Sequence, residues 1–234
     1  MREAQKVPTG RRNRYEAILF DLDGTLYDLR LLAPLLGLAS IRDLGRLAAL
    51  VWARESKAGI DFGSRDALVD AIALDASLRL KGEEAEDLRR WYEECLYGRF
   101  VSVLRGFCRA RPCVRRFLAE RGRTVRPAGA DRREWPALGV LSDYGHVDDR
   151  IHAIGLDPHQ FDLRLSNEDE GALKPAARPF LRAAELFGVE AEKVLVVGDR
   201  DGFDGAGAAA AGMDYVRVAT PREARSFFRG LMEK

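Results

Sequence analysis

The chain has 234 residues, 47% of them hydrophobic, and a formal net charge of +1. This length and apolar content suffice for one domain with a sizeable insertion. Basic and acidic residues are interspersed over most of the chain, which argues against a general nucleic-acid surface, because such a surface needs a clustered basic face.

The first segment, residues 1–14, is the exception to this even distribution of charge. We expect a solvated basic tail, with nucleic acid or an anionic membrane as a less favoured partner. The tail leads to Tyr15 without an apolar segment of the kind that secretory signals contain. The most apolar run, 31–39, contains Pro34 and Gly37 and is too short to span a bilayer.

Cysteine usage bears on the cellular compartment. Cys95, Cys108 and Cys113 are odd in number and lack the paired spacing of a zinc site. Thiols in a reducing compartment are therefore expected rather than a disulfide. We predict a cytoplasmic protein, monomeric or homodimeric, that binds neither nucleic acid nor a membrane.

Short apolar runs, each bounded by turn residues, predict strands of a parallel sheet. Segments with helical character separate most of them, for example 179–187 and 203–213. Such alternation favours an α/β fold whose sheet is covered by helices on both faces. The predicted strands are Ala17–Phe20, Gly139–Ser142, Leu163–Ser166, Val194–Gly198 and Tyr215–Val218.

Residues 28–106 interrupt the alternation, because they are rich in Leu, Ala, Arg and Glu and contain no convincing strand. An apolar stripe at helical spacing predicts a first helix. Ser64 is expected to cap a second helix, which carries Leu68, Ile72 and Leu78. Glu83-Glu84 is expected to begin a third helix, which runs through Leu88, Trp91 and Leu96. The stripe of the first helix consists of Ile41, Leu44, Leu47, Ala48 and Val51. We predict a helical cap domain over 28–106, inserted into a core domain formed by 15–27 and 107–234.

A second irregular stretch, 123–137, contains prolines, a glycine and charged residues without a clear period. It joins a helix to the amino end of the strand that ends at Ser142. Ligands bind at the carboxyl ends of strands in an open parallel sheet. We therefore expect the stretch to lie away from the site.

The segment Asp21-Leu22-Asp23-Gly24-Thr25 follows the first predicted strand and carries the most information. A strand would point Asp21 and Asp23 to the same side, which is costly unless a cation or a shared proton relieves the repulsion. Phosphoryl transfer could use one carboxylate as nucleophile and metal ligand and the other as proton donor. An acidic turn of ordinary kind is the structural alternative.

Three more polar signals follow at the ends of later strands. Ser142-Asp143 ends one strand, Lys174-Pro175 follows an acidic loop, and Asp199 ends another strand with Asp204 five positions later. Each alone could be a helix cap, a turn or a surface charge. Together they supply metal ligands, a hydroxyl donor, a cation and an acid/base.

These segments, in this order, resemble the haloacid dehalogenase superfamily, specifically its phosphatase-like branch with a helical cap inserted after the first motif. The resemblance covers about residues 15–220, including the ending Asp204-Gly205-Ala206-Gly207 to Met213; the stretch 123–137 departs from the usual short connection. It implies a Rossmann-like sheet with the Asp21 strand beside the Asp199 strand.

The resemblance implies a role for each matched residue. Asp21 would be the nucleophile, and magnesium would be held by Asp21, the backbone carbonyl of Asp23 and Asp199, with Asp204 as a supporting ligand or an orienting group for Lys174. Asp23 would be the general acid and base, which requires a pKa shifted upward from about 3.9. Ser142 and Lys174 would bind the phosphate, and Asp143 would offer its backbone N–H. The activity implied is magnesium-dependent hydrolysis of a small phosphorylated metabolite through an aspartyl-phosphate.

Related activities remain open at this point. Asp23 disfavours a dehalogenase, because halide needs no acid, whereas a phosphomutase would share every motif. Phosphonate cleavage would need a Schiff-base lysine, and the cap lysines, Lys57 and Lys81, have no supporting motif. A non-catalytic binding or scaffold protein would be expected to lack catalytic residues, and none is missing.

Substrate contacts are less defined. His146 follows Ser142 by four positions and is either a contact to substrate or an exposed loop imidazole. Cationic residues of the cap would either contact a second acidic group of the substrate or form a solvated helix face. These residues are Arg42, Arg46, Arg54 and Lys57.

Overall fold

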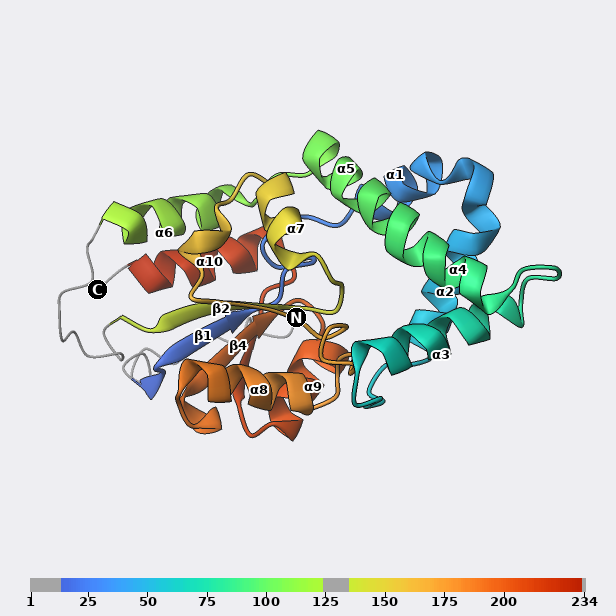
Figure 1. The fold of residues 1–234 in the computed structure, drawn as a ribbon. Helices are drawn as coiled ribbons and strands as arrows, with labels where there is room; N and C mark the ends of the chain where they lie inside the picture. Colours follow the sequence, from blue (N-terminus) through green and yellow to red (C-terminus); the bar gives the residue numbers. More distant parts are fainter. Residues whose placement is uncertain (1–13, 124–134, 233–234) are drawn as a thin grey trace, which may run out of the picture.

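The computed structural model describes residues 14–123 and 135–232. Its centre is a five-stranded parallel sheet in the order β3-β2-β1-β4-β5 (Figure 1). The strands are β1 (Ala17–Phe20), β2 (Ala137–Ser142), β3 (Leu163–Ser166), β4 (Val194–Gly198) and β5 (Asp214–Arg217). All five predicted strands are present, and β1 pairs with β4 as expected.

Helices cover both faces of this sheet, and apolar side chains pack between the helices and the sheet on each face. Ala17 and Leu19 of β1 pack with α8 (Arg178–Phe187) and α9 (Ala206–Ala210). Ile18 and Phe20 point to the other face, where the cluster includes residues of α6 (Pro112–Arg123), α7 (Val147–Ala153) and α10 (Pro221–Met232). The alternation along β1 therefore produces the α/β sandwich that the sequence predicts.

The segment between β1 and α6 is a helical cap at one end of the sheet (Figure 1). Short turns of helix lie at 41–43, 92–96, 158–160, 191–193 and 201–205. The cap helices are α1 (Leu32–Ala39), α2 (Leu44–Glu55), α3 (Arg65–Ser77), α4 (Ala85–Trp91) and α5 (Tyr97–Phe107).

The expected helix starts in the cap are confirmed. Ser64 Oγ accepts a hydrogen bond from the backbone of Ala67 at 3.3 Å, and Glu84 is the N-cap of α4. The first cap helix predicted from the apolar stripe is present as α2, and Leu47 of the stripe is buried, whereas Ile41, Leu44 and Val51 are exposed. The buried face of α2 carries Leu47, Ala49, Leu50, Ala53 and Arg54. Leu78, predicted to lie on the second cap helix, is the C-cap of α3 and is exposed.

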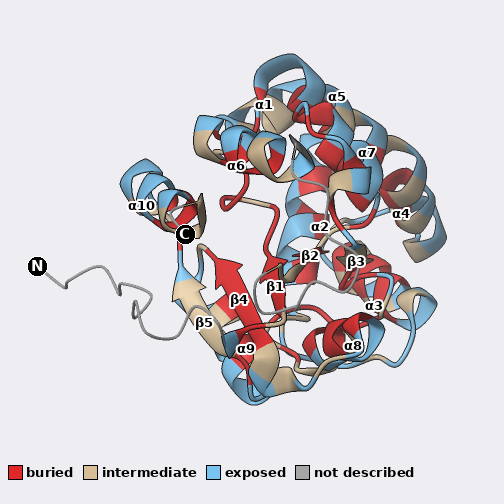
Figure 2. Ribbon diagram, turned by 90° about the vertical axis from the view of Figure 1, so that its left-hand side faces the viewer, coloured by how far each residue is buried: buried red, intermediate tan, exposed pale blue. Residues whose placement is uncertain are grey.

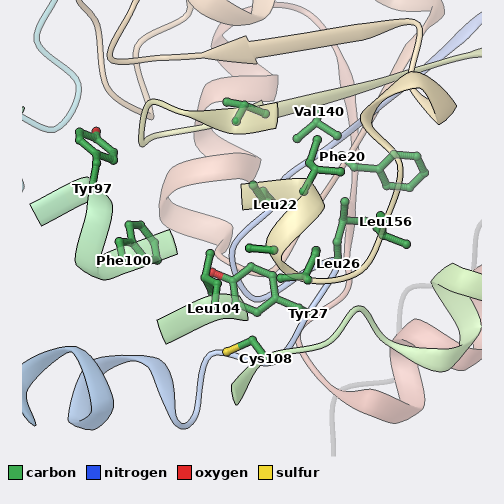
Figure 3. Packing of buried hydrophobic residues seen from close by; sticks show 14 of the residues in the cluster. Phe20, Leu22, Leu26, Tyr27, Tyr97, Phe100, Leu104, Cys108, Val140 and Leu156 are labelled. Atoms are coloured by element: carbon green, nitrogen blue, oxygen red, sulfur yellow. The ribbon is translucent and has the colours of Figure 1, made fainter. Parts of the chain in front are cut away.

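Cap and core share one continuous apolar cluster. It joins Phe20, Leu22 and Tyr27 to cap residues such as Phe100 and Leu104 (Figure 3). Most of the buried apolar residues of the cap, whose helices Figure 2 colours by burial, thus belong to the same cluster as residues of the sheet. The predicted irregular stretch 123–137 lies mostly outside the described residues, as does nearly all of the basic tail 1–14.

Candidate active site

The predicted site residues gather at the carboxyl edge of the sheet. Asp21 follows β1, Ser142 ends β2, and Asp199 follows β4. The carboxyl ends of these neighbouring parallel strands lie side by side, so residues far apart in the sequence become neighbours. Lys174 reaches the same edge from the loop between β3 and α8.

Lys174 is the cation of this group. Its Nζ lies 2.7 Å from Asp21 Oδ1, 2.7 Å from Asp204 Oδ1 and 2.9 Å from the carbonyl oxygen of Leu141. Burial alone lowers the pKa of Lys174, but the carboxylates of Asp204 and Asp21 outweigh it and raise the pKa above its ordinary value. Lys174 therefore stays charged and fixes one oxygen of Asp21.

Asp21, Asp199 and Asp204 form a cluster in which one carboxylate oxygen from each residue lies within 4.8 Å of the other two. Burial, together with the neighbouring carboxylates, raises the pKa of Asp21, and burial and Asp204 raise that of Asp199 to about 6. Among the described residues, Asp21 Oδ2 and Asp199 Oδ1 have no hydrogen-bond partner. Buried carboxylate oxygens without a donor fit a divalent cation, and an oxygen-only donor set fits magnesium.

Gly24 is required for this geometry. Its φ is +94°, and a Cβ at this position would overlap the Asp199 carboxylate. Glycine both adopts this backbone conformation and leaves room for the close approach. The Asp21-to-Gly24 turn can therefore lie directly against the end of β4.

Asp23 faces away from the carboxylate cluster. Its carboxylate accepts hydrogen bonds from Tyr27 Oη, from Ser142 Oγ at 2.9 Å, and from Arg150, which donates to both oxygens. Burial raises the pKa of Asp23, but the charge and hydrogen bonds of Arg150 outweigh it, and the pKa is lowered. The expected upward shift is therefore wrong for the ligand-free protein. The Asp23 side chain is not part of the metal cluster; a contact through its backbone carbonyl stays a prediction.

Arg150 is the residue that sequence reasoning missed. It lies on α7, and its side chain is fully buried. A signal was present, because Arg150 follows Val147 by three positions and precedes Ile154 by four, which is the spacing of one helix face, and α7 begins soon after Ser142. A charged residue at such a position needs a buried partner.

Ser142 and Asp143 have partners within the protein. Ser142 Oγ accepts from Arg150 Nη1 at 2.8 Å and from the backbone of Tyr144 at 3.2 Å. Asp143 accepts from the Asn167 side chain at 2.7 Å and from the backbone N–H of Lys174 at 2.9 Å. Asp143 therefore orders the loop that carries Lys174. Phosphate contacts by either residue stay predictions.

His146 lies at the start of α7, with a left-handed backbone (φ 54°). Its ring centroid is 4.6 Å from that of Tyr97, and its Nδ1 is 3.3 Å from Asp149. The side chain is half exposed, with a relative accessibility of 48%. The residue thus stands where cap and core meet, and contact with substrate stays a prediction.

The cationic side chains of the cap are mostly engaged with acidic partners. Arg46 pairs with Glu83 at 2.9 Å, Lys57 pairs with Asp75, and Arg42 is exposed. Arg54 is neither solvated nor free for a ligand. It is buried against Glu168 of the core at 2.7 Å and also donates to the backbone carbonyl of Asp143.

Cap and core are also joined through the backbone. The N–H of Gly59 donates to Leu173 O at 3.2 Å, and that of Phe62 donates to Gly171 O at 2.9 Å. The acceptors of these two hydrogen bonds, Gly171 and Leu173, lie just before Lys174 in the same loop. The position of the cap is thus coupled to the loop that supplies the site's lysine.

The chain is similar to one family of known proteins. The model of the haloacid dehalogenase-like hydrolase family matches residues 15–212. No curated protein gives a significant match. No described helix is long and apolar enough to cross a membrane.

Solved structures share the fold at low sequence identity. A 2-haloacid dehalogenase from Pseudomonas syringae pv. Tomato DC3000 is 24% identical, with a TM-score of 0.56 over 86% of this chain and 85% of that chain. A predicted phosphoglycolate phosphatase from Haemophilus somnus is also 24% identical, with a TM-score of 0.55 over 86% and 84% of the two chains. A β-phosphoglucomutase from Clostridium difficile is 20% identical, with a TM-score of 0.60 over 91% and 88%.

Proposed function

The chain belongs to the haloacid dehalogenase-like hydrolase family, and we propose that it is a magnesium-dependent phosphatase acting on a small phosphorylated metabolite. The observation that carries the proposal is the pair of buried carboxylate oxygens, Asp21 Oδ2 and Asp199 Oδ1, that have no donor among the described residues. A nucleophile held beside such a cation-binding set suits phosphoryl transfer.

Asp21, Asp199 and the backbone carbonyl of Asp23 would hold magnesium, with Asp204 in support. When bound, the cation would offset the repulsion between the Asp21 carboxylate and the phosphate. Asp204 accepts from Lys174 at 2.7 Å, so it also aims the lysine at the nucleophile.

Asp21 would attack phosphorus and form an aspartyl-phosphate, while Lys174 offsets the charge on the transferring group. Ser142 would turn its hydroxyl from Asp23 to a phosphate oxygen. That change would remove one hydrogen bond from the Asp23 carboxylate. The dianionic phosphate nearby would also favour protonation of Asp23.

Asp23 would protonate the leaving oxygen and then accept a proton from the water that hydrolyses the aspartyl-phosphate. Its presence distinguishes this reading from a dehalogenase, because a departing halide needs no proton. In the ligand-free state the lowered pKa keeps Asp23 ionised, which is the form that a base needs, so Asp23 would have to gain a proton when phosphate binds in order to act as the acid of the first step.

Release of inorganic phosphate from p-nitrophenyl phosphate with magnesium tests the reaction class. No release at any magnesium concentration, from folded protein, would contradict the proposal and favour a scaffold. A screen of sugar phosphates, phosphoglycolate, nucleotides and flavin or pyridoxal phosphates then identifies the substrate. Isomerised sugar phosphate without phosphate release would indicate a phosphomutase.

A further inference from the structure

Arg150 is a buried cation that the proposed reaction does not yet use. Its side chain has 0% relative accessibility, and its guanidinium carbon lies 4.6 Å from the ring centre of Phe100 and 5.6 Å from that of Tyr144. Phe100 belongs to the cap helix α5, whereas Tyr144 belongs to the core. Arg150 is thus enclosed from both sides.

Burying an arginine is costly, and the cost is offset only where its donors find well-placed acceptors. Here Nη2 donates to both oxygens of Asp23, and Nη1 donates to Ser142 Oγ at 2.8 Å and to Tyr144 O at 3.0 Å. The planar guanidinium fixes the angle between these acceptors, which a lysine ammonium cannot do. Asp23 and Ser142 are therefore held in a set relation to each other.

The two aspartates of the first motif thus have separate cations. Lys174 contacts Asp21 from the side of the carboxylate cluster, and Arg150 contacts Asp23 from the side of α7. Because each carboxylate has its own cation, two neighbouring carboxylates can be buried in the same turn. It also means that the position of Asp23 depends on a residue remote from the metal cluster.

Position matters more for Asp23 than for its neighbours. A general acid must lie within about 2.6–3.2 Å of the oxygen that it protonates. A displacement of about 1 Å can cost about 100-fold in rate. Without Arg150, Tyr27 and Ser142 would be the only side chains left to hold the Asp23 carboxylate within the part of the chain that the structure describes, and Ser142 would leave it when phosphate binds.

We propose that Arg150 is a positioning residue that holds Asp23 where it can protonate a leaving oxygen, so that esters with poor leaving groups depend on Arg150 more strongly than activated esters do. This inference rests on the proposed phosphatase function. Arg150 contacts neither the nucleophile nor the carboxylate cluster among the described residues, so its effect passes through Asp23 and Ser142.

The test compares two aryl phosphates, p-nitrophenyl phosphate and phenyl phosphate, which differ in how much the departing oxygen needs a proton. In Arg150→Met, kcat for phenyl phosphate should fall by at least about 10-fold more than kcat for p-nitrophenyl phosphate. In an Asp23→Asn background the same substitution should add less than about twofold on either ester, because coupled residues are not additive.

Arg164→Met is the matched control. Arg164 lies on β3 and pairs with Asp148 of α7 at 2.9 Å, so its loss weakens the support of the same helix without removing a contact to Asp23. It should leave the ratio of the two kcat values unchanged. If Arg150→Met does not fold, Arg150→Lys serves in its place, because it keeps a charge beside Asp23 but loses the fork that also reaches Ser142.

Different results would contradict the phosphatase function and the positioning role of Arg150. A folded wild type that hydrolyses neither ester would overturn the phosphatase function and this inference with it. An active wild type whose Arg150 variant loses the same factor on both esters, or loses as much in the Asp23→Asn background, would overturn the inference alone.

Discussion

The Oε2 atom of Glu168, in the loop after β3, lies 2.7 Å from Nη1 of Arg54 on the cap helix α2. The side chains are 0% and 6% accessible, so the ion pair is buried between cap and core. Tyr92 and Tyr97 of the cap also donate to Glu168, and Arg65 reaches its other oxygen at 3.3 Å. A core carboxylate thus receives these donors from the cap, so the contact between cap and core satisfies its hydrogen bonding.

We expect Glu168→Gln to weaken folding at neutral pH, because it leaves Arg54 buried without a counter-charge; such losses cost about 3–5 kcal/mol. Burial raises the pKa of Glu168, but Arg54 and the tyrosines outweigh it and lower the pKa. The carboxylate therefore stabilises the fold above its ordinary pKa, and this contribution is lost as pH falls through the lowered one.

Urea unfolding at neutral pH and in acid measures this effect. The difference in the free energy of unfolding between wild type and Glu168→Gln should become smaller in acid. Glu170→Gln is the control, because Glu170 lies on the same loop but pairs with the half-exposed Arg178. Equal losses of unfolding free energy in the two variants would show that the buried pair of Glu168 and Arg54 stabilises the fold no more than the pair of Glu170 and Arg178 does.

Asp21→Asn should abolish turnover of p-nitrophenyl phosphate while the far-UV spectrum and the melting temperature stay near wild type. An amide cannot act as the nucleophile, yet its oxygen can still accept from Lys174. Hydrolysis near the wild-type rate would end the aspartyl-phosphate mechanism.

Magnesium should raise the melting temperature of the wild type, because a ligand that binds only the folded state stabilises it. The shift should disappear in Asp199→Asn, which removes a ligand from the cluster, and persist in Asp201→Asn, whose exposed side chain is directed to Arg217. Activity should vanish with EDTA and return with magnesium. A melting shift of equal size in all three proteins would place the cation elsewhere.

Asp23→Asn should slow phenyl phosphate far more than p-nitrophenyl phosphate, because only the poorer leaving group needs the proton. The measurement is kcat across a series of substituted phenyl phosphates. A uniform loss along the series would reduce Asp23 to a structural role and would remove the main argument against dehalogenation.

Replacing residues 124–134 of the irregular stretch with a short turn should leave turnover and magnesium dependence within about twofold of wild type, since polar sequence without a clear period tolerates change better than core sequence does. The stretch precedes β2, which begins at Ala137, whereas Ser142 at the other end of that strand contacts Asp23. A folded, magnesium-binding variant that hydrolyses no ester would show that the segment serves the site.

Local patterns in the sequence determined the sheet and the edge at which its polar residues meet. The runs at Ala17–Phe20, Leu163–Ser166 and Val194–Gly198 are strands with the predicted bounds, because short apolar runs between turn residues have few alternatives. Parallel strands align their carboxyl ends, and the family resemblance implied that the Asp21 strand lies beside the Asp199 strand with Lys174 at the nucleophile, so the proximity of Asp21 to Asp199 and of Lys174 to Asp21 was expected.

Tertiary packing alone decided which face of α2 is buried and which cations pair with the acids. The first cap helix is present as predicted, but its buried face combines Leu47 of the predicted stripe with Leu50, which packs in the core cluster, and Arg54, which reaches Glu168. The pairing of Arg150 with Asp23 joins residues far apart in the chain, and it reverses the expected direction of the Asp23 pKa. A buried charge takes its pKa from the groups that surround it in space, and sequence spacing does not specify those groups.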